Sequence, residues 1–257
     1  MARVLGEAAR YVTGQSLKKY RQQFVILFLV SYCFALVLGF FFGFGFHRHP
    51  YYLSIPTFIL IVGLGVIALL LVNRITNNLE TKRLDFRKGA TGEALVGYLL
   101  EGLPEDYMVI HGLQLKPQYG DIDHIVVGPS GVYAIDTKNW RGVVKADGKG
   151  GLLLNGKPPD KPAIRNLTRA IMNLKDEIKF HATFNPYIYA LLVFPAARVE
   201  AKWGQTESVH CVRADQLYKY IVENKKGKKL PPKEMDAITQ AFLALARMDK
   251  DFVSNSK

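Results

Sequence analysis

Cysteine is scarce in this chain. The 257 residues contain two cysteines, Cys33 and Cys211. Cys33 lies in an apolar run and Cys211 in a strand-like segment, so neither a disulfide framework nor a cysteine-based zinc site can be built from them. This scarcity fits a protein that faces a reducing compartment such as the cytosol.

Charge is missing from two long segments near the N-terminus. Residues 24–46 and 51–72 contain no Asp, Glu, Lys or Arg. Each can cross an apolar layer of roughly 30 Å at about 1.5 Å per helical residue. A buried helical hairpin in a soluble core is the alternative, but such long uncharged runs rarely suit a globular core. The segments form a pair, and no small-residue cleavage pattern follows the first, so we expect a transmembrane hairpin rather than a cleaved signal peptide.

Acidic residues are scarce around these segments. Residues 1–88 hold 11 Lys and Arg against 3 Asp and Glu, whereas residues 89–257 hold 23 against 19. The connecting loop, residues 47–50, has a single Arg. The positive-inside bias therefore predicts an integral protein of the plasma (inner) membrane whose termini and soluble domain are cytoplasmic. Because most of the net charge of +12 flanks the membrane, that charge is weak evidence for nucleic-acid binding.

Nucleotide-binding loops and solenoid repeats are also missing. The glycine-rich residues 148–151 lack the Walker pattern, so we expect no nucleotide cofactor. No repeat of solenoid period is found. By composition the chain divides into a basic cytoplasmic lead-in (1–23), the hairpin (24–72), a charged linker (73–89) and a cytoplasmic domain (90–257).

The most informative stretch that is present covers residues 121–138. Two apolar, strand-like runs flank a Gly-Pro-Ser-Gly turn. If the runs pair as a hairpin, Asp123 and Asp136 converge at one end, and Lys138 follows on the same face. Two carboxylates beside one lysine suit a divalent metal and an attacking water. A salt bridge at the rim of a sheet is the alternative.

The soluble domain alternates between strand and helix patterns. A helix with Thr91 as its N-cap is expected to end before Pro104. Strands are expected at 107–115, 122–127, 132–135, 143–145, 152–154, 187–194 and 208–212. Further helices are expected from Pro162 to about 181, at 214–223 and at 232–248. This order predicts an α/β domain with a mixed sheet covered by helices.

Residues 120–142, GDIDHIVVGPSGVYAIDTKNWRG, resemble the core of the NERD (nuclease-related) domain. The upstream helix with Gly92 and the downstream helix opened by Pro162 fall where that family has them, so the resemblance spans about 86–200. The family is regarded as a branch of the restriction-endonuclease-like PD-(D/E)XK superfamily. The resemblance implies a restriction-endonuclease-like mixed sheet flanked by helices, and a phosphodiesterase activity that depends on Mg or Mn.

The same resemblance implies catalytic residues. Glu93 corresponds to the acid on the first helix, Asp123 to the acid on the first core strand, and residues 136–138 to the (D/E)-X-K element. The metal ligands would then be Asp123, Asp136, Glu93 and the backbone carbonyl of Thr137. Lys138 would orient the attacking water. For Glu93, an acid in a first helical turn that the helix dipole favours is the alternative.

Residues close to this motif carry further predictions. Asp121 is interpreted as a turn residue and His124 as a packing or hydrogen-bonding residue. Trp140 and Arg141 follow the lysine and can contact a base or a phosphate. Equally, Trp140 can cover the edge of the sheet.

Basic residues elsewhere are candidates for phosphate contacts. Arg165, Asn166 and Arg169 occupy neighbouring turns of one predicted helix and can approach a nucleic-acid backbone. A solvated helix face is the alternative. The basic loop at 225–229 is interpreted as solvated, with contact to nucleic acid or lipid as its alternative.

These patterns lead to one preferred function and two alternatives. The preferred function is a membrane-anchored, metal-dependent nuclease that hydrolyses DNA or RNA, with a homodimer as a possible state. The family usually has Glu where this chain has Asp136, and Gln where it has Arg165. These departures favour an inactive nuclease-fold module that binds nucleic acid or a protein partner. The other alternative is a structural membrane protein whose hairpin is the functional part.

Overall fold

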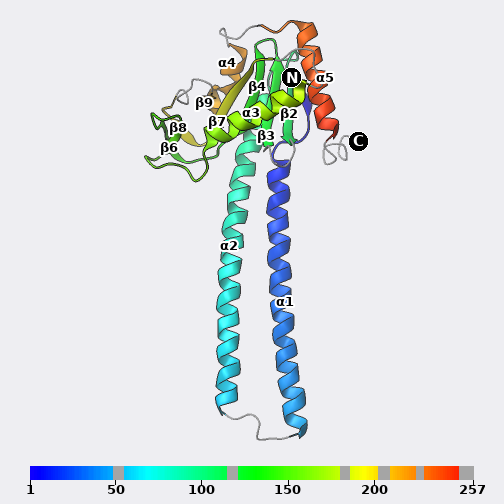
Figure 1. Ribbon diagram of the computed structural model, residues 1–257, viewed down its shortest axis with the longest axis vertical. Helices are drawn as coiled ribbons and strands as arrows, with labels where there is room; N and C mark the ends of the chain where they lie inside the picture. Colours follow the sequence, from blue (N-terminus) through cyan, green and yellow to red (C-terminus); the bar gives the residue numbers. More distant parts are fainter. Residues whose placement is uncertain (49–54, 115–120, 180–185, 202–208, 224–228, 249–257) are drawn as a thin grey trace. The chain divides into compact units, whose positions relative to one another are not determined.

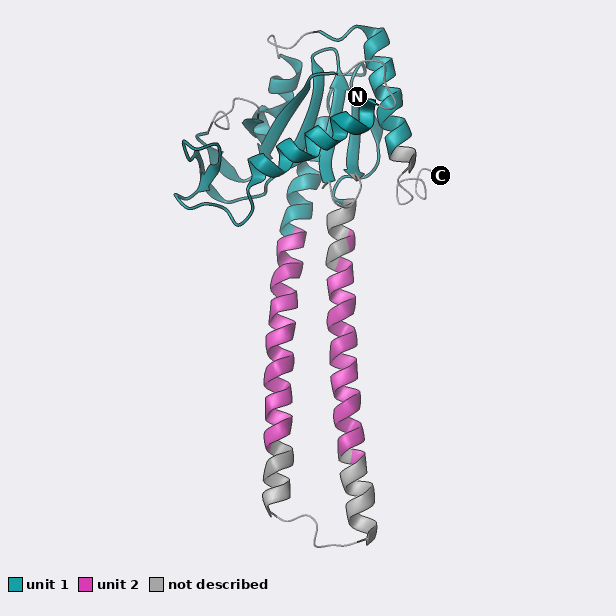
Figure 2. Ribbon diagram, viewed as in Figure 1, with its two compact units in different colours: residues 1–11, 88–257 teal, residues 12–87 magenta. Residues whose placement is uncertain are grey.

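The computed structural model describes residues 1–48, 55–114, 121–179, 186–201, 209–223 and 229–248 (Figure 1). The chain divides into two compact units (Figure 2). One contains Met1–Tyr11 and Lys88–Lys257, and the other contains Val12–Arg87. Part of the basic loop at 225–229 lies outside the described residues.

Two helices build the second unit. α1 (Arg10–Arg48) and α2 (Ile55–Glu101) supply them, and the guanidinium of Arg83 lies 5.5 Å from the ring centre of Tyr20. Among the described residues, one helical stretch, Leu17–Val37, is long and apolar enough to cross a membrane. A signal sequence near an N-terminus would pass the same test.

The second predicted span, residues 51–72, is not confirmed. Its first four residues lie outside the described part of the chain, and the search of the described residues found one candidate helix. The two-helix transmembrane hairpin therefore stays a prediction.

α2 is longer than the sequence predicts. It runs from Ile55 to Glu101, so the expected linker at 73–89 is helical and Thr91 lies inside the helix instead of capping it. No glycine or proline interrupts residues 66–88, which gives the helix no signal to stop. Glu93 is consequently far from the first turn of its helix, which removes the helix dipole as the explanation for that acid.

A six-stranded mixed sheet forms the centre of the first unit. Its order is β1-β2-β3-β4-β7-β9; β2, β3 and β4 pair antiparallel, and the β1–β2, β4–β7 and β7–β9 pairs are parallel. The strands are β1 (Arg3–Leu5), β2 (Met108–Gln114), β3 (Asp121–Gly128), β4 (Gly131–Thr137), β7 (Ile188–Phe194) and β9 (Val209–Arg213). The predicted α/β class with a mixed sheet flanked by helices is confirmed.

Helices cover both faces of this sheet. α3 (Ala163–Lys179) and α5 (Pro232–Met248) pack with the sheet in one apolar core. The end of α2 and the short α4 (Leu217–Val222), which follows a 3-10 turn at Ala214–Gln216, pack with it in the other. The strands are buried on both faces, which explains their nearly continuous apolar runs.

A small second sheet follows the central hairpin. β5 (Gly142–Ala146) lies between β6 (Leu152–Leu154) and β8 (Ala197–Val199). The sequence predicts the β5–β6 hairpin, and its register confirms that pairing. It does not predict β8, because three residues are too few to show an alternation.

Strand β1 was not predicted, since the sequence assigns residues 1–23 to a lead-in. Arg3 pairs with Met108, and the N–H of Arg3 donates to the Tyr107 carbonyl at 3.0 Å. The N–H of Ala2 donates to the Glu101 carbonyl at 3.3 Å. The N-terminus is therefore an edge strand of the domain instead of part of a basic arm.

Candidate active site

The open end of the β3–β4 hairpin brings the two predicted aspartates together. The ladder pairs His124 with Ile135, which places Asp123 and Asp136 next, opposite each other. The Oδ2 atom of Asp123 accepts a hydrogen bond from the N–H of Thr137 at 2.6 Å. The acid of β3 is therefore tied to the end of β4.

Lys138 joins this pair of acids. Its Nζ lies 2.6 Å from Oδ1 of Asp136, and the two side chains are 27% and 14% exposed. Its backbone N–H donates to the carbonyl of Val193 at 2.8 Å, so the end of the strand is also held by β7. The ammonium group thus lies beside the carboxylates at a partly open rim of the sheet.

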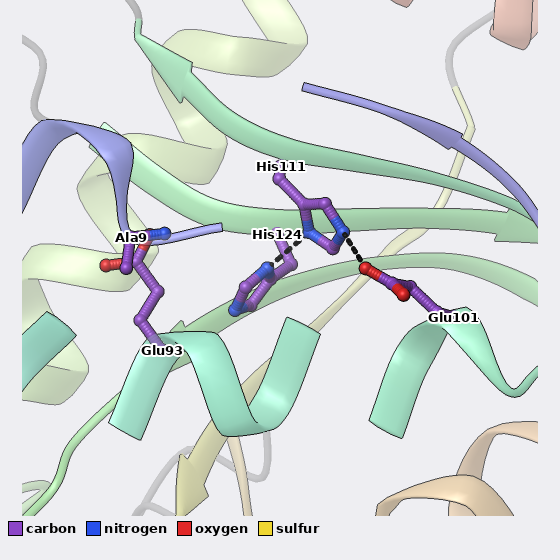
Figure 3. A network of polar contacts seen from close by, with 5 residues as sticks. All are labelled: Ala9, Glu93, Glu101, His111 and His124. Atoms are coloured by element: carbon purple, nitrogen blue, oxygen red, sulfur yellow. Dashed lines mark hydrogen bonds and ion pairs between the residues drawn. The ribbon is translucent and has the colours of Figure 1, made fainter. Parts of the chain in front are cut away.

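Glu93 reaches the same rim from α2. Its side chain is buried, and its Oε1 accepts a hydrogen bond from the N–H of Ala9 at 2.8 Å (Figure 3). Burial is the main cause that raises the pKa of Glu93 to about 7; the Ala9 N–H opposes the shift, and the charges of Asp136 and Asp121 add to it. Glu93 is therefore within electrostatic reach of the acids at the strand ends.

A close approach between α2 and the residue after Lys138 positions Glu93. A Cβ at Gly92 would lie 2.6 Å from the Cβ of Asn139, so a larger residue does not fit without movement. The side-chain amide of Asn139 donates to the Lys88 carbonyl at 2.7 Å. Sequence reasoning missed the roles of Asn139 and of the Ala9 N–H; neither residue type carries a signal for such a contact.

The cluster of Glu93, Asp123, Asp136 and Lys138 holds more negative than positive charge. Burial, followed by the charges of Asp136 and Glu93, raises the pKa of Asp123 well above its usual value. Burial alone would lower the pKa of Lys138, but attraction by Asp136 and Asp123 outweighs it and raises that pKa. A further cation would relieve the repulsion among the acids.

The donors at this rim fit a hard divalent cation. Within the described ranges, no group of three or more His, Cys, Asp and Glu side chains is arranged to hold a metal ion. Asp123 and Asp136 offer two carboxylates, and the Thr137 carbonyl lies on the β3 side of the strand, where its own N–H meets Asp123. Mg²⁺ accepts such oxygen ligands and keeps several waters.

Residues 88–195 form a nuclease-related (NERD) domain. An uncharacterized protein of Bacillus anthracis is 34% identical to the chain over 94 residues, which cover 35% of this chain and 44% of that protein. The chain thus matches less than half of the length of this relative. No solved structure matches the chain. The predicted NERD resemblance is confirmed, whereas membership of the PD-(D/E)XK superfamily stays a prediction.

Other predicted residues of the NERD domain have clear positions. Asp121 is the first residue of β3 and is exposed, so it belongs to the strand rather than to a turn. His124 is buried and hydrogen-bonds with His111, as its predicted role requires. Trp140 packs against Phe194 with ring centres 5.5 Å apart, which favours the alternative that it covers the core.

The predicted phosphate contacts lie apart from the cluster's bonds. Arg141 is exposed just before β5. Arg165 and Arg169 are exposed on α3, and Asn166 is half-buried there. Among the described residues, none of these four side chains hydrogen-bonds or forms an ion pair with the acid cluster. Their contact with nucleic acid remains a prediction.

Proposed function

We propose that the protein is a membrane-anchored, metal-dependent nuclease that hydrolyses phosphodiester bonds of DNA or RNA. The observation that carries this proposal is the convergence of Glu93, Asp123, Asp136 and Lys138 at one rim of a nuclease-related domain. A rim with excess negative charge repels phosphate unless a cation is added, which is why the proposal includes Mg²⁺ or Mn²⁺.

Each side chain has a distinct role in this mechanism. Asp123, Asp136 and the Thr137 carbonyl would hold the cation, and Glu93 would contact it through water. When bound, the cation supplies Lewis acidity and lowers the pKa of a bound water. Lys138 Nζ, 2.6 Å from Asp136, orients the attacking water and offsets charge on the phosphate.

Glu93 is suited to exchange a proton in this site. A carboxyl group with a pKa of about 7 is partly protonated near neutral pH. Its Oε1 is oriented by the Ala9 N–H, so the other carboxylate oxygen is left to face the waters at the rim. The N-terminal segment thereby helps to position a residue of the proposed site.

The anchor is also part of this proposal. Leu17–Val37 would be one span and residues 51–72 the other, with both termini and the NERD domain in the cytoplasm of a cell whose inner membrane holds the hairpin. Cysteine-substitution labelling at the loop between the helices, from outside and inside sealed vesicles, tests this topology. Labelling of the loop from the cytoplasmic side would contradict it.

Cleavage by the full-length protein tests the activity. Residues 1–11 belong to the domain, so a fragment that starts at the linker would lack β1 and Ala9. We expect cleavage of labelled DNA or RNA with Mg²⁺ or Mn²⁺, its loss with chelator, and its loss in Asp136→Asn and Lys138→Met. Asp176→Asn changes an exposed acid on α3 and serves as the matched control. Normal cleavage by both site variants would refute the assignment.

One observation favours the inactive binding module as a second candidate. Both aspartates already have partners within the chain, since Asp123 accepts from Thr137 and Asp136 binds Lys138. Calorimetric titration with Mn²⁺ separates the two functions. A catalytic site binds Mn²⁺ and loses this binding in Asp123→Ala, whereas an inactive module shows no Mn²⁺ heat at this site.

A further inference from the structure

A pocket lies at the same edge of the sheet as the acid cluster. It has a volume of about 350 Å³ and is formed by the chain segments that follow β7 and β9. Its lining residues are Phe194, Pro195, Ala196, Ala197, Arg198, Arg213, Ala214 and Asp215. Two guanidinium groups therefore border one pocket, although their residues are distant in sequence.

Strand register relates this pocket to the cluster. β4, β7 and β9 are parallel neighbours, with Thr137 paired to Val193 and Phe194 paired to Arg213. Neighbouring strands are about 4.8 Å apart, so the pocket begins roughly 5–10 Å from the end of β4. A nucleic-acid strand advances about 3.4 Å per phosphate along its axis, so this separation corresponds to roughly two or three nucleotides.

The two arginines are available to an incoming anion. Arg198 is 75% exposed and lies 3.2 Å from Glu200, and Arg213 is 49% exposed and lies 2.8 Å from Asp215. Ion pairs this exposed contribute little free energy, so a phosphate can compete with them. Each pair engages one Nη2 atom, which leaves further guanidinium donors for phosphate oxygens.

We propose that Arg198 and Arg213 bind a backbone phosphate of the nucleic acid, a few nucleotides from the bond that the acid cluster cleaves. This inference rests on the proposed nuclease function. Both arginines lie beyond residue 195, where the NERD match ends, so the site belongs to the C-terminal part of the chain. The acid cluster repels the strand, and the arginine pocket attracts it beside that cluster.

Binding of labelled single-stranded DNA and RNA to the full-length protein tests the site. Measurements use fluorescence anisotropy in an Asp136→Asn background, so that the probe is not consumed. The test variant is Arg198→Gln with Arg213→Gln. The control, Arg165→Gln with Arg169→Gln, removes the same charge from α3. We expect the test pair to raise Kd about tenfold and to reduce the salt slope by roughly one phosphate contact, and the control pair to change Kd less than threefold.

Cleavage assays with Asp136 intact separate the two proposals. We expect Arg198→Gln with Arg213→Gln to raise KM while kcat at saturating substrate is retained. Cleavage by the wild type with no change in Kd or KM in the test pair would overturn the phosphate site and leave the nuclease proposal standing. An equal loss of affinity in the test and control pairs would reduce the effect to bulk charge and also overturn the site. A wild type that neither binds nor cleaves nucleic acid would overturn both proposals.

Discussion

Two buried polar clusters lie beneath the same stretch of α2, and burial affects them differently. One is the acid cluster near Glu93, and the other pairs His111 with His124 two turns further along the helix, near Glu101 (Figure 3). Gly97 covers the rings: a Cβ there would lie 3.5 Å from His111 and 3.6 Å from His124. The comparison shows how one helix covers a reactive rim and an inert core.

The histidine pair is held in the neutral form. The two Nδ1 atoms are 2.8 Å apart, so one ring donates the proton between them and the other accepts it. Burial lowers the pKa of His111 to about 4, and burial together with His111 lowers the pKa of His124 well below its usual value. Two neutral rings satisfy each other on one side and need no added ion.

The acid cluster lacks such an internal solution. Burial raises the pKa values of Glu93 and Asp123, and their mutual repulsion raises them further. Lys138 compensates one charge among three acids. The remaining charge destabilises the fold at neutral pH and at the same time prepares the rim for a cation, which links low stability at this rim to the proposed function.

The largest expected effect is on cleavage. Asp123→Asn removes one metal-binding carboxylate, and we expect kcat/KM to fall by roughly a thousandfold while the thermal midpoint at pH 8 is unchanged or higher. Cleavage assays and thermal unfolding of the same preparations measure both effects. The control Asp176→Asn should retain activity and stability. If Asp123→Asn unfolds the domain, the acid is structural and resembles the histidine pair instead.

The histidine pair is expected to show the opposite behaviour. His124→Leu leaves His111 without its partner in a dry core, and we expect a loss of about 1–3 kcal/mol in the free energy of unfolding. Changing both histidines to Leu removes both polar groups, so the double variant should lose less than the two single variants combined. Denaturant titrations of the two single variants and the double variant measure this coupling. Additive losses would show that the Nδ1 contact contributes nothing.

Local patterns in the sequence were enough to predict the centre of the site. The hairpin of β3 and β4 alternates clearly around its turn, so the meeting of Asp123 and Asp136 follows from a period of two. The position of Glu93 at the rim was predicted from the NERD resemblance alone. Its cause, the close approach of Gly92 to Asn139, involves residues distant in sequence and cannot be derived from either segment by itself.

The missed elements are short or depend on distant partners. β1 and β8 have three residues each, and their pairing is set by strands far away in the chain. Thr91 looked like an N-cap because it precedes an apolar stripe, yet the preceding residues continue the helix. The pairing of His111 with His124 depends on the β2–β3 register, which the apolar pattern of β2 alone does not fix.

Glu93→Gln provides a smaller and more local test. It removes a buried charge but keeps the shape of the side chain and an oxygen that can accept from the Ala9 N–H. We expect the free energy of unfolding at pH 8 to rise by roughly 1–3 kcal/mol without metal, because the raised pKa makes ionisation of Glu93 unfavourable in the fold. The gain should shrink when Mn²⁺ is added, since a cation stabilises the wild-type carboxylate. A loss of stability at pH 8 would contradict the raised pKa.

The smallest expected effect is the net response of the wild type to acid, because the two clusters respond with opposite sign. The pKa of His111 is lowered from 6.5 to about 4, so the unfolded chain binds more protons in that range and stability falls as the pH drops below 6.5. The pKa of Glu93 is raised from 4.5 to about 7, so the folded state binds more protons and stability rises as the pH drops from 7 to 4.5.

Variants separate these opposing contributions between pH 7 and 4.5. Glu93→Gln should lose stability more steeply than the wild type as the pH falls, and the variant with Leu at both histidine positions should lose it less steeply or gain stability. Each titrating group contributes at most about 1.4 kcal/mol per pH unit, so the differences are measurable by denaturant titration at several pH values. Parallel stability curves for the wild type and both variants would show that neither cluster changes its protonation on folding, and the contrast between them would be lost.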